Sequence, residues 1–136
     1  MKYDQIMKLE DEATVLYDKY SKSMGDIDKI AANLNIDREV VAQVHSHMFV
    51  DEHLVKQGLN PSETCLSKFD PSIDQARAWT RLIDGTFVRS DLRLFLHEYL
   101  ESSIMLAYMK NTGRPLEYTI AHKLANCIHN WQDFVN

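Results

Sequence analysis

A histidine and two glutamates interrupt an apolar stretch of this sequence, residues 92–107, and their types and spacing could do chemistry. His97 and Glu101 are four residues apart, so on a helix their side chains point in the same direction. Burying ionisable groups costs free energy unless they meet a partner, a metal ion or a proton. Three roles therefore stay open for His97, Glu98 and Glu101: a metal clamp, metal-free acid/base chemistry, or a structural pair within a packed interface.

The run from residue 97 to residue 101 has the spacing of the HExxH signature of zinc proteases, with glutamate in the last position. In that signature the two end residues bind zinc on one helical face, and the internal glutamate activates water. A carboxylate can replace a histidine as a ligand, but a third ligand must then come from elsewhere. We expect it from His122, with His47 or His53 as alternatives. The predicted cofactor is a divalent ion such as zinc, held by His97, Glu101 and His122.

Other candidates lie upstream of this run. His45 and His47 are close in sequence, and Asp51 follows His47 by four residues, a spacing that would orient its imidazole. We favour His47, because His45 is offset by about half a helical turn. The planar guanidinium of Arg81 could bind phosphate or carboxylate through two parallel hydrogen bonds. The commoner role of such an arginine is an ion pair, here with Glu98 or Glu101. The predicted catalytic residues are His97, Glu98, Arg81 and His47.

Size and composition are those of one soluble globular domain, residues 1–136. Hydrophobic residues make up 45% of the chain and charged residues 26%. The net charge of -5 excludes a general electrostatic attraction for nucleic acid or for anionic membranes. The two cysteines, Cys65 and Cys127, lack metal or disulfide spacing and are expected to be free thiols.

Neither a signal peptide nor an apolar run of the roughly 18 residues that span a membrane is found in the sequence. We therefore expect a cytoplasmic protein that does not interact with membranes. Delivery by a specialised secretion system would leave no mark in the sequence and stays open.

Helical spacing dominates the chain, and only 4 glycines and 3 prolines interrupt it. The prediction is an all-α fold, an irregular bundle of about six helices around a buried central helix. That central helix, at about residues 90–110, is apolar on nearly all sides and should be enclosed by its neighbours. A loop is expected at 56–68. The other expected helices cover about residues 3–19, 26–34, 37–54, 70–84 and 116 onwards.

Residues 28–41 resemble a helix-turn-helix, with apolar spacing that fits two short helices crossing through a tight turn. A recognition helix here would offer DNA only Arg38, Gln43, His45 and Ser46, within an acidic chain. The pair of helices is therefore expected mainly to contribute packing.

From residue 26 to the end, the order of motifs resembles a family of domains at the C-termini of phage-associated and polymorphic-toxin-like bacterial proteins. Residues 1–25, the first helix, lie outside the resemblance. The segments that carry it are residues 28–31, 47–53, 69–71, 78–85, 90–92, 97–101, 117–118 and 121–122. The resemblance implies a delivered effector or toxin, a hydrolase acting on nucleic acid or on another intracellular target. The polar residues of this sequence that match motif positions of the family are His47, His53, Arg81, His97, Glu98, Glu101 and His122.

Three functions follow as hypotheses. The leading one is a small toxin-like or effector-like enzyme, a hydrolase that uses the His/Glu cluster in a cleft open to water or substrate. The alternative is a non-catalytic module that binds a protein partner or a second copy as a homodimer, with a purely structural cluster. The third is a helix-turn-helix DNA-binding regulator.

Overall fold

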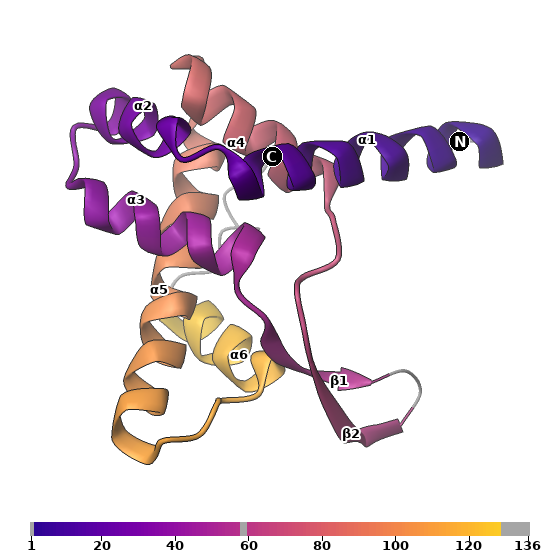
Figure 1. Ribbon diagram of the computed structural model, residues 1–136, viewed down its shortest axis with the longest axis vertical. Helices are drawn as coiled ribbons and strands as arrows, with labels where there is room; N and C mark the ends of the chain where they lie inside the picture. Colours follow the sequence, from indigo (N-terminus) through magenta and orange to yellow (C-terminus); the bar gives the residue numbers. More distant parts are fainter. Residues whose placement is uncertain (1, 58–59, 129–136) are drawn as a thin grey trace.

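One long helix, α5, contacts α3, α4 and α6, whereas α1 and α2 pack against α4, and the chain also forms a small two-stranded sheet (Figure 1). The structure, a computed structural model, describes residues 2–57 and 60–128. Its α-helices are α1 (Tyr3–Lys22), α2 (Gly25–Leu34), α3 (Arg38–His45), α4 (Ile73–Asp84), α5 (Arg89–Thr112) and α6 (Tyr118–Ile128). A π-helix, η1 (Ser46–Val50), follows α3, and strands β1 (His53–Gln57) and β2 (Asn60–Ser67) pair antiparallel. The predicted all-α class is confirmed.

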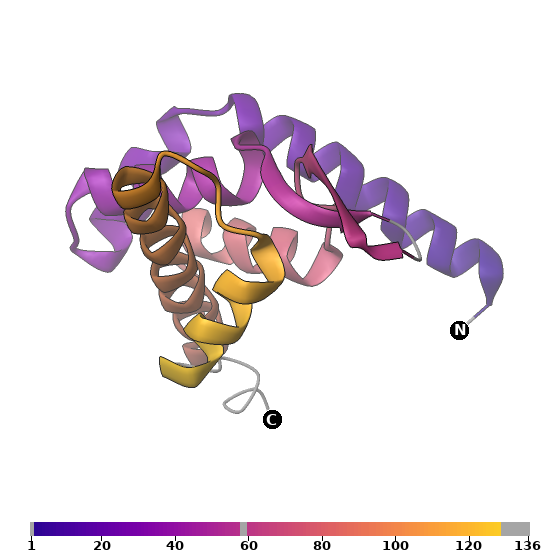
Figure 2. The ribbon, with the colours of Figure 1, turned by 90° about the horizontal axis from the view of Figure 1, so that it is seen from below.

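Two groups of elements pack against α5. Helices α3 and α4 contact it together with η1, and α6 packs beside its middle (Figures 1 and 2). The apolar core lies among α1 to α4 and the first turns of α5, around Trp79, Ile27 and Ile30. The N-terminal part of α1 projects beyond the body of the protein in both views. Among the described helices, none is both long and apolar enough to cross a membrane.

The expectation that α5 is enclosed on all sides is wrong. Leu92, Leu96 and Leu106 are between 39% and 56% exposed. The buried face of α5 instead carries polar groups, which include Asp91, His97, Glu98, Glu101 and Ser102. Because these residues occupy the inner face, part of the apolar sequence is left facing solvent.

Residues 56–68 are not the loop that the sequence predicts. Val55 pairs with Cys65 and Lys56 with Thr64 in the hairpin, so cross-strand hydrogen bonds satisfy backbone groups that a loop would leave to water. The helix predicted over 37–54 also ends early, at His45, and passes through η1 into β1. His53 therefore lies on a strand. Of the breaker residues, Asn60, Pro61 and Ser62 belong to β2, and Gly58 lies outside the described residues.

Helix α4 begins at Ile73 and not at Asp70, because Ser72 is its N-cap and its hydroxyl accepts a hydrogen bond from the Gln75 amide. Its end is as predicted: Gly85 has φ +77°, a left-handed conformation that glycine adopts without strain. The final helix begins at Tyr118, two residues after the predicted start.

The predicted helix-turn-helix-like pair is present as α2 and α3, joined through Asn35 in the left-handed region. The residues that α3 would offer to DNA are engaged within the protein. Arg38 forms an ion pair with Asp28 at 2.8 Å, and His45 is buried with its ring nitrogen 2.6 Å from the Tyr20 carbonyl. The pair contributes packing, as expected.

A bidentate ion pair links helices α4 and α5. Arg81 Nε and Nη2 donate to the two oxygens of Asp91 at 2.7 and 2.8 Å. Asp91 is 2% exposed, and it also accepts the Val88 amide, which lies at the start of α5. Arg81 therefore pairs with Asp91 and not with Glu98 or Glu101.

We predict that Asp91→Ala lowers the free energy of unfolding by about 2 kcal/mol, because charge-assisted hydrogen bonds from Arg81 and the cap on α5 are lost together. Urea unfolding measures the change. The matched control is Asp11→Ala, an exposed carboxylate on α1, for which less than about 0.5 kcal/mol is expected. Equal losses in the two variants would contradict the structural role of Asp91.

Candidate active site

One carboxylate, Glu101, lies at the centre of a cluster built from three parts of the chain. Helix α5 supplies His97, Glu98 and Glu101 from its buried face, η1 supplies His47, and α6 supplies His122. Glu101 is 1% exposed and His97 is fully buried. The His122 side chain is 35% exposed, so the cluster reaches solvent on the α6 side.

Each oxygen of Glu101 faces different imidazoles. The Nε2 of His47 is 2.8 Å from Oε1, and the Nδ1 of His122 is 2.9 Å from Oε2. The Nε2 of His97 lies 3.4 Å from the same Oε2, on the adjacent turn of α5. His47 is also 3.3 Å from Glu98. The side chains that sequence spacing put forward as ligands or bases thus meet at one carboxylate.

The surroundings of His122 Nδ1 are crowded with electron-rich atoms. Besides Glu101 Oε2, the Nε2 of His97 and the hydroxyl of Tyr118 both lie 3.3 Å from it. An imidazole nitrogen carries one proton or one lone pair in the ring plane, so it cannot serve three neighbours at full strength. A cation between these ligand atoms would be attracted to all of them at once.

Aromatic rings enclose the cluster. Phe69 stacks on His53 with ring centroids 4.1 Å apart, and it also contacts His47 and Tyr118 edge to face or tilted. His53 Nε2 donates to the His47 carbonyl at 2.8 Å and so links β1 to η1. These rings limit the positions that the His47 side chain can adopt.

Burial and pairing move two pKa values in this cluster in opposite directions. Burial alone would lower the pKa of His47, but hydrogen bonds to Glu101 and Glu98 outweigh it and raise that pKa to about 9. Burial alone would raise the pKa of Glu101, yet His47, His97 and His122 hold it at about 2. Burial lowers the pKa of His53 and raises that of Tyr118. Tyr118 therefore stays a protonated hydroxyl near neutral pH.

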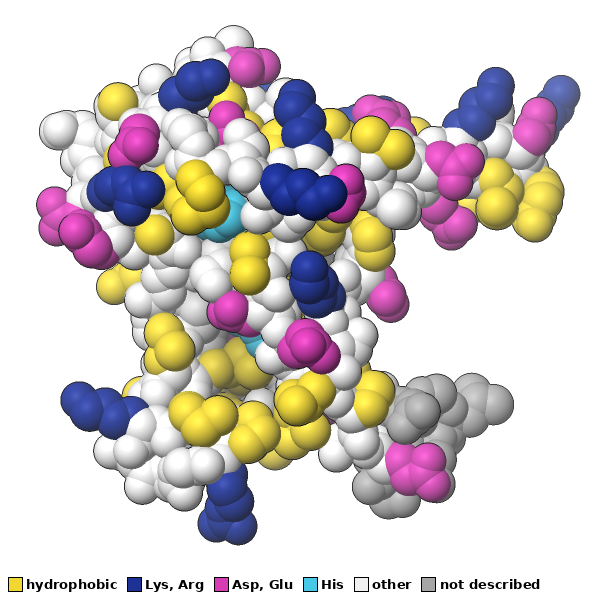
Figure 3. All heavy atoms as spheres, in the orientation of Figure 1, with side chains coloured by type: hydrophobic (Ala, Val, Ile, Leu, Met, Phe, Trp, Pro, Cys, Tyr) yellow, Lys and Arg dark blue, Asp and Glu magenta, His cyan; other side chains and the backbone are white. Residues whose placement is uncertain are grey.

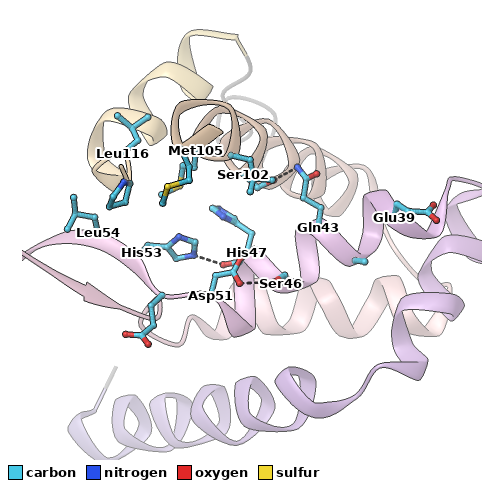
Figure 4. A pocket seen from close by; sticks show the side chains of 15 residues that line it. Glu39, Gln43, Ser46, His47, Asp51, His53, Leu54, Ser102, Met105 and Leu116 are labelled. Atoms are coloured by element: carbon cyan, nitrogen blue, oxygen red, sulfur yellow. Dashed lines mark hydrogen bonds between the residues drawn. The ribbon is translucent and has the colours of Figure 1, made fainter. Parts of the chain in front are cut away.

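Two cavities approach the cluster from different sides. One, of about 650 Å³, is lined by His47 and His53 together with residues of α3 and α5 (Figure 4). The second, of about 400 Å³, is lined by Glu98, Tyr118 and Phe69, with Lys56 and Lys68 at its edge. Of the cluster, His47 lines the first cavity and Glu98 the second, whereas His97, Glu101 and His122 line neither of the two. The His47–Glu98 pair lies between the two cavities.

The geometry of His97, Glu101 and His122 fits a metal ion. Their contacts of 2.9, 3.3 and 3.4 Å approach the roughly 3.3 Å that separates ligands around tetrahedral zinc. A second set, His47, Glu98 and Glu101, also gathers its ligand atoms within 4.8 Å and shares Glu101 with the first. One divalent ion would balance the charges of Glu98 and Glu101, whereas His47 alone balances one of them.

Most of the predicted site residues come together here, and some do not. His47, His97, Glu98, Glu101 and His122 form the cluster, while Arg81 lies with Asp91 on another part of α5. Asp51 does not orient His47, because it accepts a hydrogen bond from Ser46 at 2.8 Å. Sequence reasoning did not assign a role to Tyr118 or Phe69. The only signal in the sequence was their occurrence within motif segments of the resembling family.

Comparisons of the chain with protein-family models, with curated proteins and with solved structures find no match. Function is therefore inferred from the chemistry of the site itself.

We predict that the metal-free protein, prepared with EDTA, is most stable between about pH 4.5 and 6.5. The raised pKa of His47 contributes stability that is complete below 6.5 and is lost as the pH rises through about 9. The lowered pKa of Glu101 contributes stability that is complete above 4.5 and is lost as the pH falls towards 2. Urea unfolding across this range measures both effects.

The matched control for this pH profile is Glu101→Gln, which keeps the shape of the side chain but removes its charge. Its stability should fall less between pH 6.5 and 9, because His47 then retains only Glu98 as an anionic partner. Identical profiles for the two proteins would contradict the coupling of His47 to Glu101.

Proposed function

We propose that this protein is a metal-dependent hydrolase, with one divalent ion such as zinc bound by His97, Glu101 and His122. The observation that carries the proposal is the convergence of two imidazoles on one oxygen of a buried carboxylate. Two histidines and a glutamate form a ligand set of catalytic zinc sites, which keep a fourth position open for water. The partial exposure of His122 provides a route for the ion and for that water.

The remaining residues of the cluster have separate roles in this proposal. When bound, the ion would lower the pKa of a coordinated water and polarise the bond to be cleaved. Glu98 accepts the proton of the attacking water, as the residue after the first histidine does in HExxH enzymes. His47 holds the Glu98 carboxylate at 3.3 Å, and the Tyr118 hydroxyl remains a hydrogen-bond donor beside His122.

A toxin-like or effector-like role for this hydrolase is supported by the order of motifs from residue 26 onwards, which resembles domains of phage-associated and toxin-like bacterial proteins. DNA recognition is less well supported, because Arg38 pairs with Asp28 and His45 is buried. A protein-interaction module is the second candidate. The exposed apolar side chains of α5, Leu92 and Leu96, which line a shallow groove with Ile36 and Phe87, favour it.

We predict one equivalent of bound zinc per chain, measured by elemental analysis after dialysis. His122→Asn should reduce zinc to below about 0.2 equivalents, because a three-ligand site loses an imidazole. His47→Asn is the matched control and should retain zinc, since His47 belongs to the other ligand set. If the His47 variant lost zinc and the His122 variant kept it, the ion would be bound by His47, Glu98 and Glu101, and the proposed ligand set would be wrong.

We predict that Glu98→Gln retains zinc but lowers the rate of hydrolysis by about 100-fold or more, the usual effect of losing a general base. Hydrolysis is measured on labelled casein, labelled RNA, p-nitrophenyl acetate and bis(p-nitrophenyl) phosphate. Glu10→Gln, an exposed carboxylate on α1, is the matched control. Absence of hydrolysis by the zinc-loaded protein on all four substrates would contradict the proposed function.

A further inference from the structure

The larger cavity beside His47 has a distinct chemical character. Its walls are largely apolar and come from β1, from α5 and from the segment before α6; they are Leu54, Met105, Leu106, Met109, Pro115 and Leu116. Figure 4 shows Leu54, Met105 and Leu116 around the space into which His47 and His53 project. An apolar enclosure of about 650 Å³ is large enough for two or three side chains of a bound chain molecule.

The charged residues that line this cavity are acidic. Glu39, Asp51 and Glu52 line it, and none of the described residues that line it is a lysine or an arginine. In Figure 3 acidic side chains lie above a band of hydrophobic ones on this face, with histidine visible between them and a basic side chain beside them. A phosphate-rich ligand would be repelled there, whereas a cationic group would be attracted.

One residue of the cluster, His47, faces this cavity. The imidazole of His47 lines it, and the same ring lies 2.8 Å from Glu101 and 3.3 Å from Glu98. Glu98 itself lines the second cavity. Polar groups of α3 and α5 beside the cavity are already engaged, since Gln43 donates to Ser102 and Ser103 at 2.8 and 2.9 Å. A ligand that fills the cavity therefore meets the cluster at His47.

We propose that this cavity binds a peptide segment in which basic and apolar side chains are neighbours. The apolar side chains occupy the walls formed by Met105, Leu106 and Leu116, and the basic groups lie against Glu39, Asp51 and Glu52. Binding here does not depend on the proposed hydrolysis, because the proposed base Glu98 lines the other cavity.

Fluorescence anisotropy of a dansyl-labelled, end-capped octapeptide of alternating leucine and lysine tests the ligand class. The zinc-loaded protein should bind it at least tenfold more tightly than the leucine–glutamate or serine–lysine octapeptides, and more tightly than a labelled 20-nucleotide RNA. The triple variant Glu39→Gln, Asp51→Asn, Glu52→Gln should weaken binding of the leucine–lysine peptide about tenfold. Leu106→Ser with Met109→Ser, both exposed positions, should weaken it as well.

The matched control is Glu10→Gln, Asp11→Asn, Glu63→Gln, which removes the same charge from exposed positions away from the cavity. Unchanged affinity in this variant supports a local effect, and an equal loss in both triple variants overturns the proposal. Binding of the leucine–glutamate peptide or of the RNA as tightly as the leucine–lysine peptide also overturns it.

Mass spectrometry of the bound peptide separates this inference from the proposed function. Selective binding without cleavage supports the ligand class and leaves the hydrolase to be decided by the four-substrate assay. Cleavage of another substrate, without selective binding of the leucine–lysine peptide, leaves the hydrolase and overturns the ligand class.

Discussion

The rest of the structure depends on how two buried carboxylates on α5, Glu98 and Glu101, are compensated. A buried charge without partners costs several kcal/mol, at least about 3 when one member of a pair is removed. The compensation comes from distant parts of the chain, with His47 from η1 and His122 from α6. The cluster therefore fixes where η1 ends and where α6 docks against α5.

This requirement explains features of the fold that apolar packing does not. The π-helical turn η1 places His47 within hydrogen-bond distance of Glu101. The hairpin that follows places His53 so that it donates a hydrogen bond to the His47 carbonyl. Phe69, just after β2, then packs against both imidazoles. Because polar groups take the inner face of α5, the apolar residues Leu92 and Leu96 face solvent. Polar pairing, as well as apolar burial, holds η1 and α6 against the middle of α5.

Periodicity and spacing were enough to predict the all-α class, the α2–α3 pair and the shared helical face of His97 and Glu101, because these depend on local sequence. His122 was also predicted as a partner, from its chemistry. The hairpin was not predicted, because its stability comes from pairing between strands and its short segments carry breaker residues. The partner of Arg81 was missed for a related reason. The acid on α5 that meets Arg81 is determined by the angle at which α4 and α5 cross, and spacing along one helix does not give that angle.

In the proposed hydrolase, the charge of the cluster favours one ion over two. Two ligand sets share Glu101, but two divalent ions would bring four positive charges to two carboxylates in a buried site. A single ion would balance both carboxylates beside a neutral His47, and the set of His97, Glu101 and His122 offers two imidazoles and a partly exposed edge at His122. His47 lines the acidic cavity and contacts Glu98, whereas Glu98 faces the second cavity. A ligand in the acidic cavity would therefore meet the cluster at His47, and the proton transfer proposed for Glu98 would take place on the other side of that ring.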